Sequence, residues 1–451
     1  MSNGNAPQKV TSFSDMVTIC EPLLTKHLAL VDGVPCICRN RLVPKKPPVK
    51  EWRPIGDGEL GELRILTESR FKELGYKPQI TKNNMADVAA YIVQYPELEI
   101  CSALETIKGI KWDGNSRLCY LPDMLGWHAP DGMDPEMEEV YLRFVVDVLF
   151  LAPIQRMRQP TTVDFVPILV GRQGVGKSRF LRSIANIDFD VNPANPKQYS
   201  MIAGVHSLAG RELRDSVFSQ STGKMVVEWA ECDQILTRDN EPRMKAIIDQ
   251  AQYTYREPYA RTVTEHPIYC ATVFTTNVQS VLTDVENRRY LPVDMRGGDF
   301  PYDDVEFVRQ MWAEAYFRVV ELGDTYRDLI TDNPKLQEFC DKVTSAHTDL
   351  PTDVEAYLNF AKDLLDNPYN CGSMPWADLD GQFANRFPQY YNKAQSQTLH
   401  RKVKQFAFRY GMVVRKVTHH ILMGNNGKKM SVGQSWGLCL ADQEIDETDS
   451  E

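Results

Sequence analysis

Residues 166–181 read VPILVGRQGVGKSRFL, and this stretch decides the fold. An apolar run over residues 166–170 breaks into a glycine-rich turn, and an amphipathic segment follows Lys177 and Ser178. The turn has the form G-x4-G-K-S. In such a turn the backbone N–H groups face phosphates, the lysine reaches the β- and γ-phosphates, and the serine binds magnesium. The stretch therefore predicts an ATP and Mg²⁺ site formed by Gly171, Gln173, Gly174, Val175, Gly176, Lys177, Ser178 and Arg179.

Apolar runs and helix-like stretches alternate on the C-terminal side of this turn. FVPILV, KMVVEW, ATVFTT and RRYLPVD are strand-like, and they fall between residues 160 and 300. This alternation is typical of an α/β fold with a mainly parallel sheet. We expect a P-loop ATPase domain over 158–345, a mostly helical domain over 51–157, and a partly disordered segment over 1–50.

Polar residues follow two of the predicted strands, where a nucleotide site needs them. In KMVVEWAECD, Glu228 would orient the magnesium ion and Glu231 would polarise the attacking water, and the two roles can be exchanged. Asn277 ends the strand ATVFTT, beside the expected γ-phosphate, although asparagine is also a common turn former.

Two arginines, Arg288 and Arg289, precede the last apolar strand. They suit an arginine finger directed into the site of a neighbouring subunit, and the alternative is a surface salt bridge. Between the acids and Asn277, basic and aromatic residues interleave as they do in single-strand channels. A helix and a hairpin with surface charge is the alternative for this segment, which holds Lys245, Arg256, Tyr259 and Arg261.

The C-terminal region separates charge strongly. The net charge of the chain is -10, yet residues 381–441 contain no Asp or Glu and ten Lys or Arg. Helical patterns over 352–365, 376–390 and 395–410 precede two strand-like segments joined by GNNG, a hairpin signal. We expect a basic winged-helix-like module over 346–441 and an acidic tail over 442–451, the alternative being a basic surface that binds the tail or another protein. The DNA-binding candidates in the module are Arg401, Lys402, Lys404, Arg415, Lys416, Lys428 and Lys429.

The composition is that of an ordinary globular protein, with 43% hydrophobic and 25% charged residues. No apolar run is long enough to span a membrane, and the polar N-terminus has no signal-peptide core. The ten cysteines are scattered, which favours a reduced environment such as the cytoplasm of a bacterial host cell.

Taken in order, GRQGVGKS, VVEWAE, KAIID, YREPYAR, FTTN and NRRYLPV resemble the virulence-associated protein E family, whose members are AAA+-type P-loop proteins of phages and mobile islands related to superfamily 3 helicases. IKWDGNSRL, residues 110–118, resembles the Trp-Asp-Gly element of that family. The resemblance implies a hexameric ring with ATP between subunits and DNA in its pore. It assigns Lys177 and Ser178 to Walker A, Glu228 and Glu231 to Walker B, Asn277 to the sensor, and Arg288 or Arg289 to the finger. We find no primase acidic triad, so a separate primase or polymerase is an expected partner.

Three function classes follow from these patterns. The first is an ATP-driven helicase or translocase that acts as a ring on single-stranded or forked DNA during replication of a phage or mobile element. The second is an origin-binding or helicase-loading factor that ATP switches without unwinding. The third is a small-molecule kinase, against which the two arginines and the basic module argue.

Overall fold

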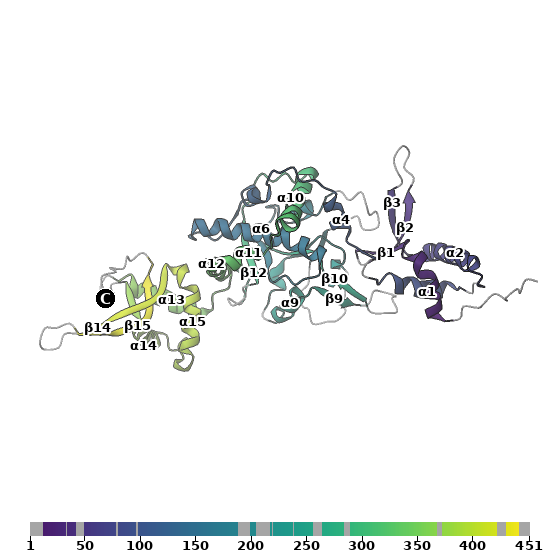
Figure 1. The fold of residues 1–451 in the computed structure, drawn as a ribbon. Coiled ribbons are helices and arrows are strands. Elements are labelled where there is room, and N and C mark those ends of the chain that lie inside the picture. Colours follow the sequence, from purple (N-terminus) through teal and green to yellow (C-terminus); the bar gives the residue numbers. More distant parts are fainter. Residues whose placement is uncertain are drawn as a thin grey trace, which may run out of the picture.

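The computed structural model describes residues 12–32, 34–41, 49–77, 80–95, 98–187, 199–203, 217–218, 220–237, 239–255, 264–283, 289–367, 372–421 and 430–441. They form three bodies that follow one another along the chain, each with its own hydrophobic core (Figure 1). Within these ranges, no helix combines the length and the apolar character that crossing a bilayer requires.

The N-terminal body packs three helices against a four-stranded sheet. Its elements are α1 (Phe13–Leu24), β1 (Leu28–Val31), β2 (Val34–Arg41), β3 (Val49–Pro54), α2 (Asp57–Glu73), α3 (Lys82–Ile92) and β4 (Glu99–Ile100). The strand order is β3-β2-β1-β4, and β4 is parallel to β1. Leu24, Leu63 and Val88 bring one fully buried side chain from each helix into the core.

Helix α1 begins at Phe13, and the Ser12 hydroxyl caps it by accepting a hydrogen bond from Asp15 N at 3.1 Å. This body corrects the sequence analysis in one place. The region from residue 51 is not one helical unit, because α2 and α3 pack with this sheet while the later helices belong to the next core. Strand β3 was missed because prolines and lysines surround it and it pairs with β2 alone.

The central body is an α/β structure. Its helices are α4 (Ser102–Lys108), α5 (Leu121–Leu125), α6 (Pro135–Arg158), α7 (Lys177–Ile184), α9 (Glu241–Ile248), α10 (Val305–Phe317), α11 (Asp328–Asp332) and α12 (Pro334–Ala346). Its strands are β5 (Trp127–His128), β6 (Val166–Val170), β7 (Tyr199–Ile202), β8 (Val226–Ala230), β9 (Gln252–Tyr255), β10 (Thr264–Pro267), β11 (Ala271–Thr276) and β12 (Tyr290–Met295). Strands β9 and β10 form a separate antiparallel pair, and the other six form one sheet.

The six-stranded sheet confirms the expected mainly parallel arrangement. Its order is β5-β12-β6-β11-β8-β7, and all of its strands except β5 run parallel. The chain leaves β6 for β7, β8 and β11 on one side and then crosses to β12 on the other. Strand order therefore reverses at β6. In open parallel sheets, ligands bind in the crevice beyond the carboxyl end of the strand at such a point. The glycine-rich turn occupies that position.

Helix α6 lies at the centre of this body (Figure 1). Its acidic first turn and basic last turn suit the helix dipole, and most of its residues from Tyr141 to Met157 are buried. They share one hydrophobic cluster with Leu169, Val273 and Leu291 of the sheet. The expected division between residues 157 and 158 therefore falls inside a common core.

The C-terminal body has the helices and the hairpin that its sequence patterns predict. Its elements are α13 (Thr352–Leu365), β13 (Ser373–Pro375), α14 (Trp376–Arg386), α15 (Ser396–Phe406), β14 (Met412–Ile421) and β15 (Met430–Leu440). The sheet order is β13-β15-β14. A half-buried carboxylate ties the helices together, since Asp380 accepts hydrogen bonds from Tyr357 Oη at 2.7 Å, Tyr391 Oη at 2.8 Å and His400 Nε2 at 2.9 Å.

Candidate functional site

The glycine-rich turn connects β6 to α7 in a conformation that needs glycine. Gly174 and Gly176 have φ angles of 81° and 107°, in the left-handed region. A Cβ atom on Gly176 would lie 2.6 Å from Tyr302 Oη, and one on Gly171 would lie 2.6 Å from Met295 O. Tyr302 and Met295 of the same chain therefore pack directly against the backbone of the turn. Helix α7 begins where the turn ends.

Lys177 lies folded back into this turn. Its buried ammonium donates to Gly171 O at 2.5 Å, to Arg172 O at 3.1 Å and to Asn277 Oδ1 at 2.9 Å. Burial lowers the pKa of Lys177, and the nearby Glu228 carboxylate opposes that shift. The structure thus joins the lysine of the turn to the asparagine that follows β11, two residues that the sequence analysis selected separately.

Glu228 is fully buried at the centre of β8, and three hydroxyl groups surround it. Its Oε1 accepts from Ser178 Oγ and from Thr275 Oγ1, both at 2.7 Å, and its Oε2 accepts from Tyr199 Oη. Burial and the hydrogen bond to Glu228 raise the pKa of Tyr199, which keeps the phenol protonated as a donor. The predicted pair of Ser178 and Glu228 is therefore in contact. Tyr199 and Thr275 are further site residues that sequence analysis missed.

Glu231 stands apart from this cluster. It follows β8 with a φ of 54°, its side chain is exposed, and its Oε2 accepts from Gln234 Nε2 at 3.1 Å. Asp233, which the sequence analysis did not select, instead accepts from Thr276 Oγ1 at 2.7 Å. The second carboxylate thus faces solvent beyond the strand end, and its role in polarising water stays a prediction.

The remaining residues of the turn shape its rim. Gln173 is exposed, and Val175 packs against the central core. Arg179 lies 4.4 Å over the Tyr302 ring and pairs with Asp303 at 2.9 Å. Because Tyr302 also abuts Gly176, the arginine and the ring together brace the start of α7.

A cleft of about 440 Å³ opens on the β12 side of the turn. Asp294 in its wall accepts from Gln279 Nε2 at 2.7 Å and lies 3.2 Å from His347 Nε2. Burial works to raise the pKa of Asp294, but the contacts with His347 and Gln279 and the charge of His128 together outweigh it and the pKa is lowered. The cleft therefore lies on the β12 side of the turn, whereas the buried Glu228 cluster lies on its β8 side. The lining residues are His128, Val170, Gly171, Arg172, Gln279, Asp294, Met295 and Arg296.

Arg289 lies at the opposite edge of the sheet from the turn. Its carbonyl accepts from Val166 N at the amino end of β6, and its guanidinium forms an ion pair with Asp249 just after α9. Five residues of β6 separate this point from Gly171, which is about 16 Å along a strand. Arg289 therefore does not contact the turn of its own chain. Arg288, the other finger candidate, lies outside the described residues.

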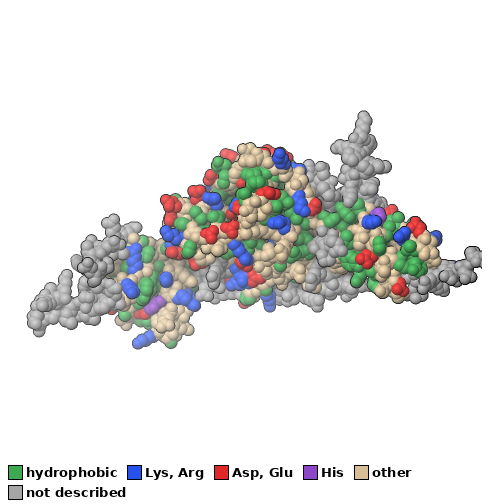
Figure 2. Space-filling model, viewed as in Figure 1, with side chains coloured by type: hydrophobic (Ala, Val, Ile, Leu, Met, Phe, Trp, Pro, Cys, Tyr) green, Lys and Arg blue, Asp and Glu red, His purple; other side chains and the backbone are tan. Residues whose placement is uncertain are grey.

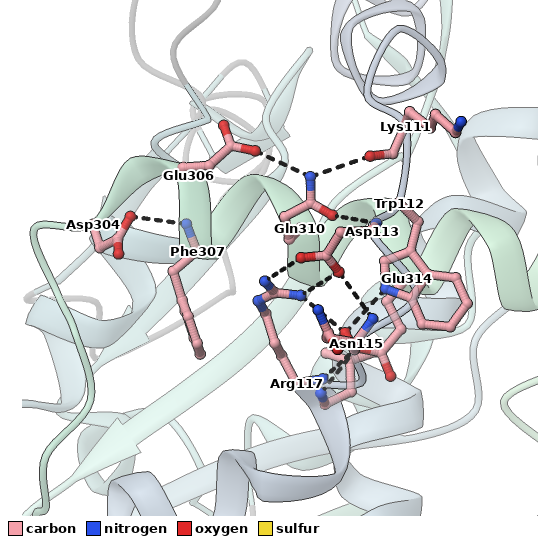
Figure 3. A network of polar contacts seen from close by, with 11 residues as sticks. Lys111, Trp112, Asp113, Asn115, Arg117, Asp304, Glu306, Phe307, Gln310 and Glu314 are labelled. Atoms are coloured by element: carbon pink, nitrogen blue, oxygen red, sulfur yellow. Dashed lines mark hydrogen bonds and ion pairs between the residues drawn. The ribbon is translucent and has the colours of Figure 1, made fainter.

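The Trp-Asp-Gly element forms a loop docked on α10 (Figure 3). Glu314 accepts from Ser116 Oγ at 2.5 Å, from Arg117 N at 2.6 Å and from Leu118 N at 3.2 Å. Asp113 pairs with Arg117 at 2.7 Å, and Trp112 packs against Phe317 in a tilted arrangement with the ring centroids 4.8 Å apart. The Arg117 guanidinium lowers the pKa of Asp113. This element is thus a structural clasp between the segment before α5 and helix α10.

The DNA-binding candidates fall into two groups. Lys245 lies on α9 and pairs with Glu241 at 3.0 Å. Arg401, Lys402 and Lys404 lie on α15, and Arg415 and Lys416 lie on β14. Figure 2 shows Lys and Arg side chains over the C-terminal body, whereas acids gather along the rim of the central body. Five candidates lie outside the described residues: Arg256, Tyr259, Arg261, Lys428 and Lys429.

A family model described as the virulence-associated protein E-like domain matches residues 104–329. The match spans half of the chain, and the protein belongs to this family. It contains the glycine-rich turn, Glu228, Asn277 and Arg289. No curated protein matches the sequence.

Solved structures of the NrS-1 C-terminal region in its apo state are similar in part. One is 12% identical over 95% of this chain and 99% of that chain with a TM-score of 0.37, and another is 12% identical over 94% and 99% with a TM-score of 0.36.

Proposed function

We propose that the protein is an ATP-hydrolysing DNA motor, a superfamily 3-like helicase or translocase that works as a ring in the replication of a phage or mobile element. One observation carries the proposal. At the strand that marks the reversal of sheet order, Lys177 contacts Asn277 and Ser178 contacts Glu228. These are the groups that phosphoryl transfer from a nucleoside triphosphate requires, held around one glycine-rich turn.

The lysine is positioned to bind phosphate. Its ammonium donates hydrogen bonds to the carbonyl oxygens of Gly171 and Arg172, which are neutral acceptors. Phosphate oxygens form charge-assisted hydrogen bonds that are shorter and stronger, so a bound triphosphate replaces these carbonyls. The backbone N–H groups of the turn and the N-terminus of α7 add to the attraction.

The residues beside the turn fit a magnesium ion. Mg²⁺ prefers oxygen ligands and commonly takes only one or two from protein, with phosphate and water completing the octahedron. Ser178 and Glu228 supply that number and are already in contact. No group of three or more His, Cys, Asp or Glu side chains able to hold a metal occurs among the described residues, which agrees with a shared protein and phosphate site. The ion would offset the negative charge on the β- and γ-phosphates.

Hydrolysis needs a positioned water. In the reaction, water oxygen bonds to the γ-phosphorus while the bond to the β–γ bridging oxygen breaks, which gives ADP and phosphate. Asn277 offers its amide N–H group to that water while its oxygen holds Lys177. Glu231 is the exposed carboxylate beyond β8 that can take the proton, and Arg289 would complete the site of a neighbouring subunit.

The DNA partner follows from charge. Residues 381–441 carry ten basic and no acidic side chains, and they form a helix pair followed by a hairpin, as in winged-helix modules. Such a field attracts the phosphate backbone, whereas base recognition needs further contacts. Because DNA synthesis requires a primer and a polymerase, and we find no primase acidic triad in this sequence, we also propose a separate primase or polymerase as partner.

One observation favours a second function. The basic C-terminal body is a complete unit with its own hydrophobic core, so it can hold DNA whatever the ATP site does. An origin-binding or helicase-loading factor, in which ATP switches assembly without unwinding, uses the same parts.

Steady-state ATP turnover separates the two. We would measure purified protein with and without single-stranded DNA, and use Lys177→Ala as the blank. Strong stimulation by DNA, absent in the blank, is the result expected for a motor. Slow turnover that DNA leaves unchanged would overturn the motor and support the switch. Turnover equal in Lys177→Ala and wild type would refute the assignment of the ATP site.

A further inference from the structure

The hairpin of the C-terminal body presents one exposed tryptophan beside a lysine. Lys416 on β14 and Trp436 on β15 are direct cross-strand partners. Opposite residues of an antiparallel pair place their Cβ atoms about 4.5–5.5 Å apart on the same face. Both side chains are exposed, Trp436 to 53%.

This exposure is unusual among the tryptophans of the chain. All seven tryptophans lie in the described residues: Trp127, Trp229 and Trp312 are buried, and Trp52, Trp112 and Trp376 are half-buried. Trp436 thus differs from the other six. Tryptophan combines a large apolar ring with one polar N–H group, and it is enriched where proteins contact their partners.

The packing of the hairpin explains where the ring sits. On the same face, two residues towards the base, the partners are Val414 and Leu438, and Leu438 is fully buried in the core of this body. Trp436 lies on the same face of the hairpin as Leu438, just beyond the edge of the core. The base of the hairpin is anchored, so the ring stands on a fixed strand rather than on a loop.

The surroundings attract a polyanion. Arg415 neighbours Lys416 along β14, and the 381–441 segment contains no carboxylate side chain. All charged side chains of this segment, apart from histidine, are basic. A flat aromatic face beside a cation matches the chemistry of unpaired nucleotides, whose bases stack and whose phosphates pair with lysine. A duplex hides its base faces in the stack, so it cannot use the ring in this way.

We propose that the β14–β15 hairpin is a single-strand binding element, in which Trp436 stacks on an unpaired base and Lys416 contacts the adjacent phosphate. The inference rests on the proposed DNA partner, and it specifies that the C-terminal body binds single-stranded DNA. It also makes the hairpin, rather than α15 alone, the element that distinguishes single-stranded from duplex DNA.

The test uses the full-length protein and two probes, oligo-dT and a blunt duplex of equal length. The probes are titrated without ATP and followed by fluorescence anisotropy and by intrinsic tryptophan fluorescence. We expect oligo-dT to quench wild-type fluorescence, because the one exposed tryptophan is the one that stacks. Trp436→Ala should weaken oligo-dT binding about 5- to 100-fold, and Trp436→Phe, which keeps a ring, should restore most of it. Lys416→Ala should reduce the salt dependence of binding by about 0.7 in the log–log slope.

Tyr390→Ala is the matched control, because Tyr390 is another exposed aromatic residue of the same body, 37% accessible. The Tyr390→Ala protein should bind oligo-dT like wild type. Duplex affinity should stay within twofold in every Trp436 variant. The proposal is overturned if oligo-dT leaves the wild-type fluorescence unchanged, if Trp436→Ala binds oligo-dT normally, or if it loses duplex and single-strand affinity equally. In each of these cases DNA-stimulated ATP turnover that depends on Lys177 would still stand, so the two proposals fail separately.

Discussion

Arg289 offers the sharpest test of how the ATP site is completed. Its carbonyl bonds to Val166 N at the amino end of β6, about 16 Å along the strand from Gly171. An arginine there cannot touch a γ-phosphate bound in the turn of its own chain. If it is the finger, it acts in the next subunit, and Arg289→Ala should lower turnover about 10³- to 10⁵-fold, or roughly 4–7 kcal/mol of barrier.

The assay mixes equal amounts of two variants that are each expected to be inactive, under conditions in which subunits exchange. Lys177→Ala lacks the lysine of the turn but keeps Arg289, and Arg289→Ala keeps the turn but lacks the finger. Half of the subunits then have a working turn, and half of these face a neighbour that keeps Arg289. About a quarter of wild-type turnover should return, whatever the ring size, if assembly is random and each interface is head-to-tail.

Asp249→Ala is the matched control. It breaks the same ion pair while keeping the arginine, and both partners are partly exposed, at 32% and 41% for Arg289 and Asp249. Such a pair contributes only about 0–1 kcal/mol to stability, so neither variant should unfold. The reasoning is refuted if Arg289→Ala hydrolyses ATP normally, or if the mixture co-assembles and stays inactive. If Arg288→Ala also hydrolyses normally, neither arginine is the finger.

Three further outcomes follow from buried hydrogen bonds. Tyr199→Phe leaves an oxygen of Glu228 without its donor, so the free energy of unfolding should fall by about 1–3 kcal/mol and turnover should need severalfold more Mg²⁺; unchanged Mg²⁺ dependence would contradict this role. Glu314→Ala removes three hydrogen bonds that hold the Trp-Asp-Gly loop and should cost about 3 kcal/mol in urea unfolding, with Glu314→Gln milder because its oxygen still accepts. Burial favours a raised pKa for Asp380, but its three donors outweigh burial and lower the pKa, so its contribution is present above about pH 4 and is lost as the pH falls through the folded value. Asp380→Asn should therefore flatten the acid side of the stability profile, and an unaltered profile would show that another group controls it.

The sequence predicted those site residues that follow directly from strand ends. Glu228 lies in one strand and Asn277 follows another, and parallel strands bring such positions to one edge of a sheet. Lys177 and Ser178 come with the turn itself. These predictions needed only local patterns and a parallel arrangement, and the structure brings Lys177 into contact with Asn277 and Ser178 into contact with Glu228.

Other parts of the site depended on long-range pairing that no local pattern encodes. Strand β7 is four residues long and only its last residue is buried, so nothing in YSMI indicated a strand or placed Tyr199 against Glu228. Asp294 and His347 are 53 positions apart and meet only because α12 packs on β12. The N-terminal sheet was missed for a similar reason, since β2 carries charged residues and pairs with a strand next to prolines.

The connection between the candidate site and the C-terminal body is also non-local. The segment that leaves β11 after Asn277 reaches Leu282, whose N donates to His347 O at 2.9 Å and whose O accepts from Asp349 N at 2.9 Å. Residues 347–349 lead directly into α13, and Arg409 of the C-terminal body donates to Thr348 O at 2.9 Å. Backbone hydrogen bonds on both sides of Thr348 therefore fix the start of the C-terminal body to the loop that begins at Asn277. Because the DNA-binding candidates of α15 and β14 belong to that body, they are attached to this loop and not to a free linker.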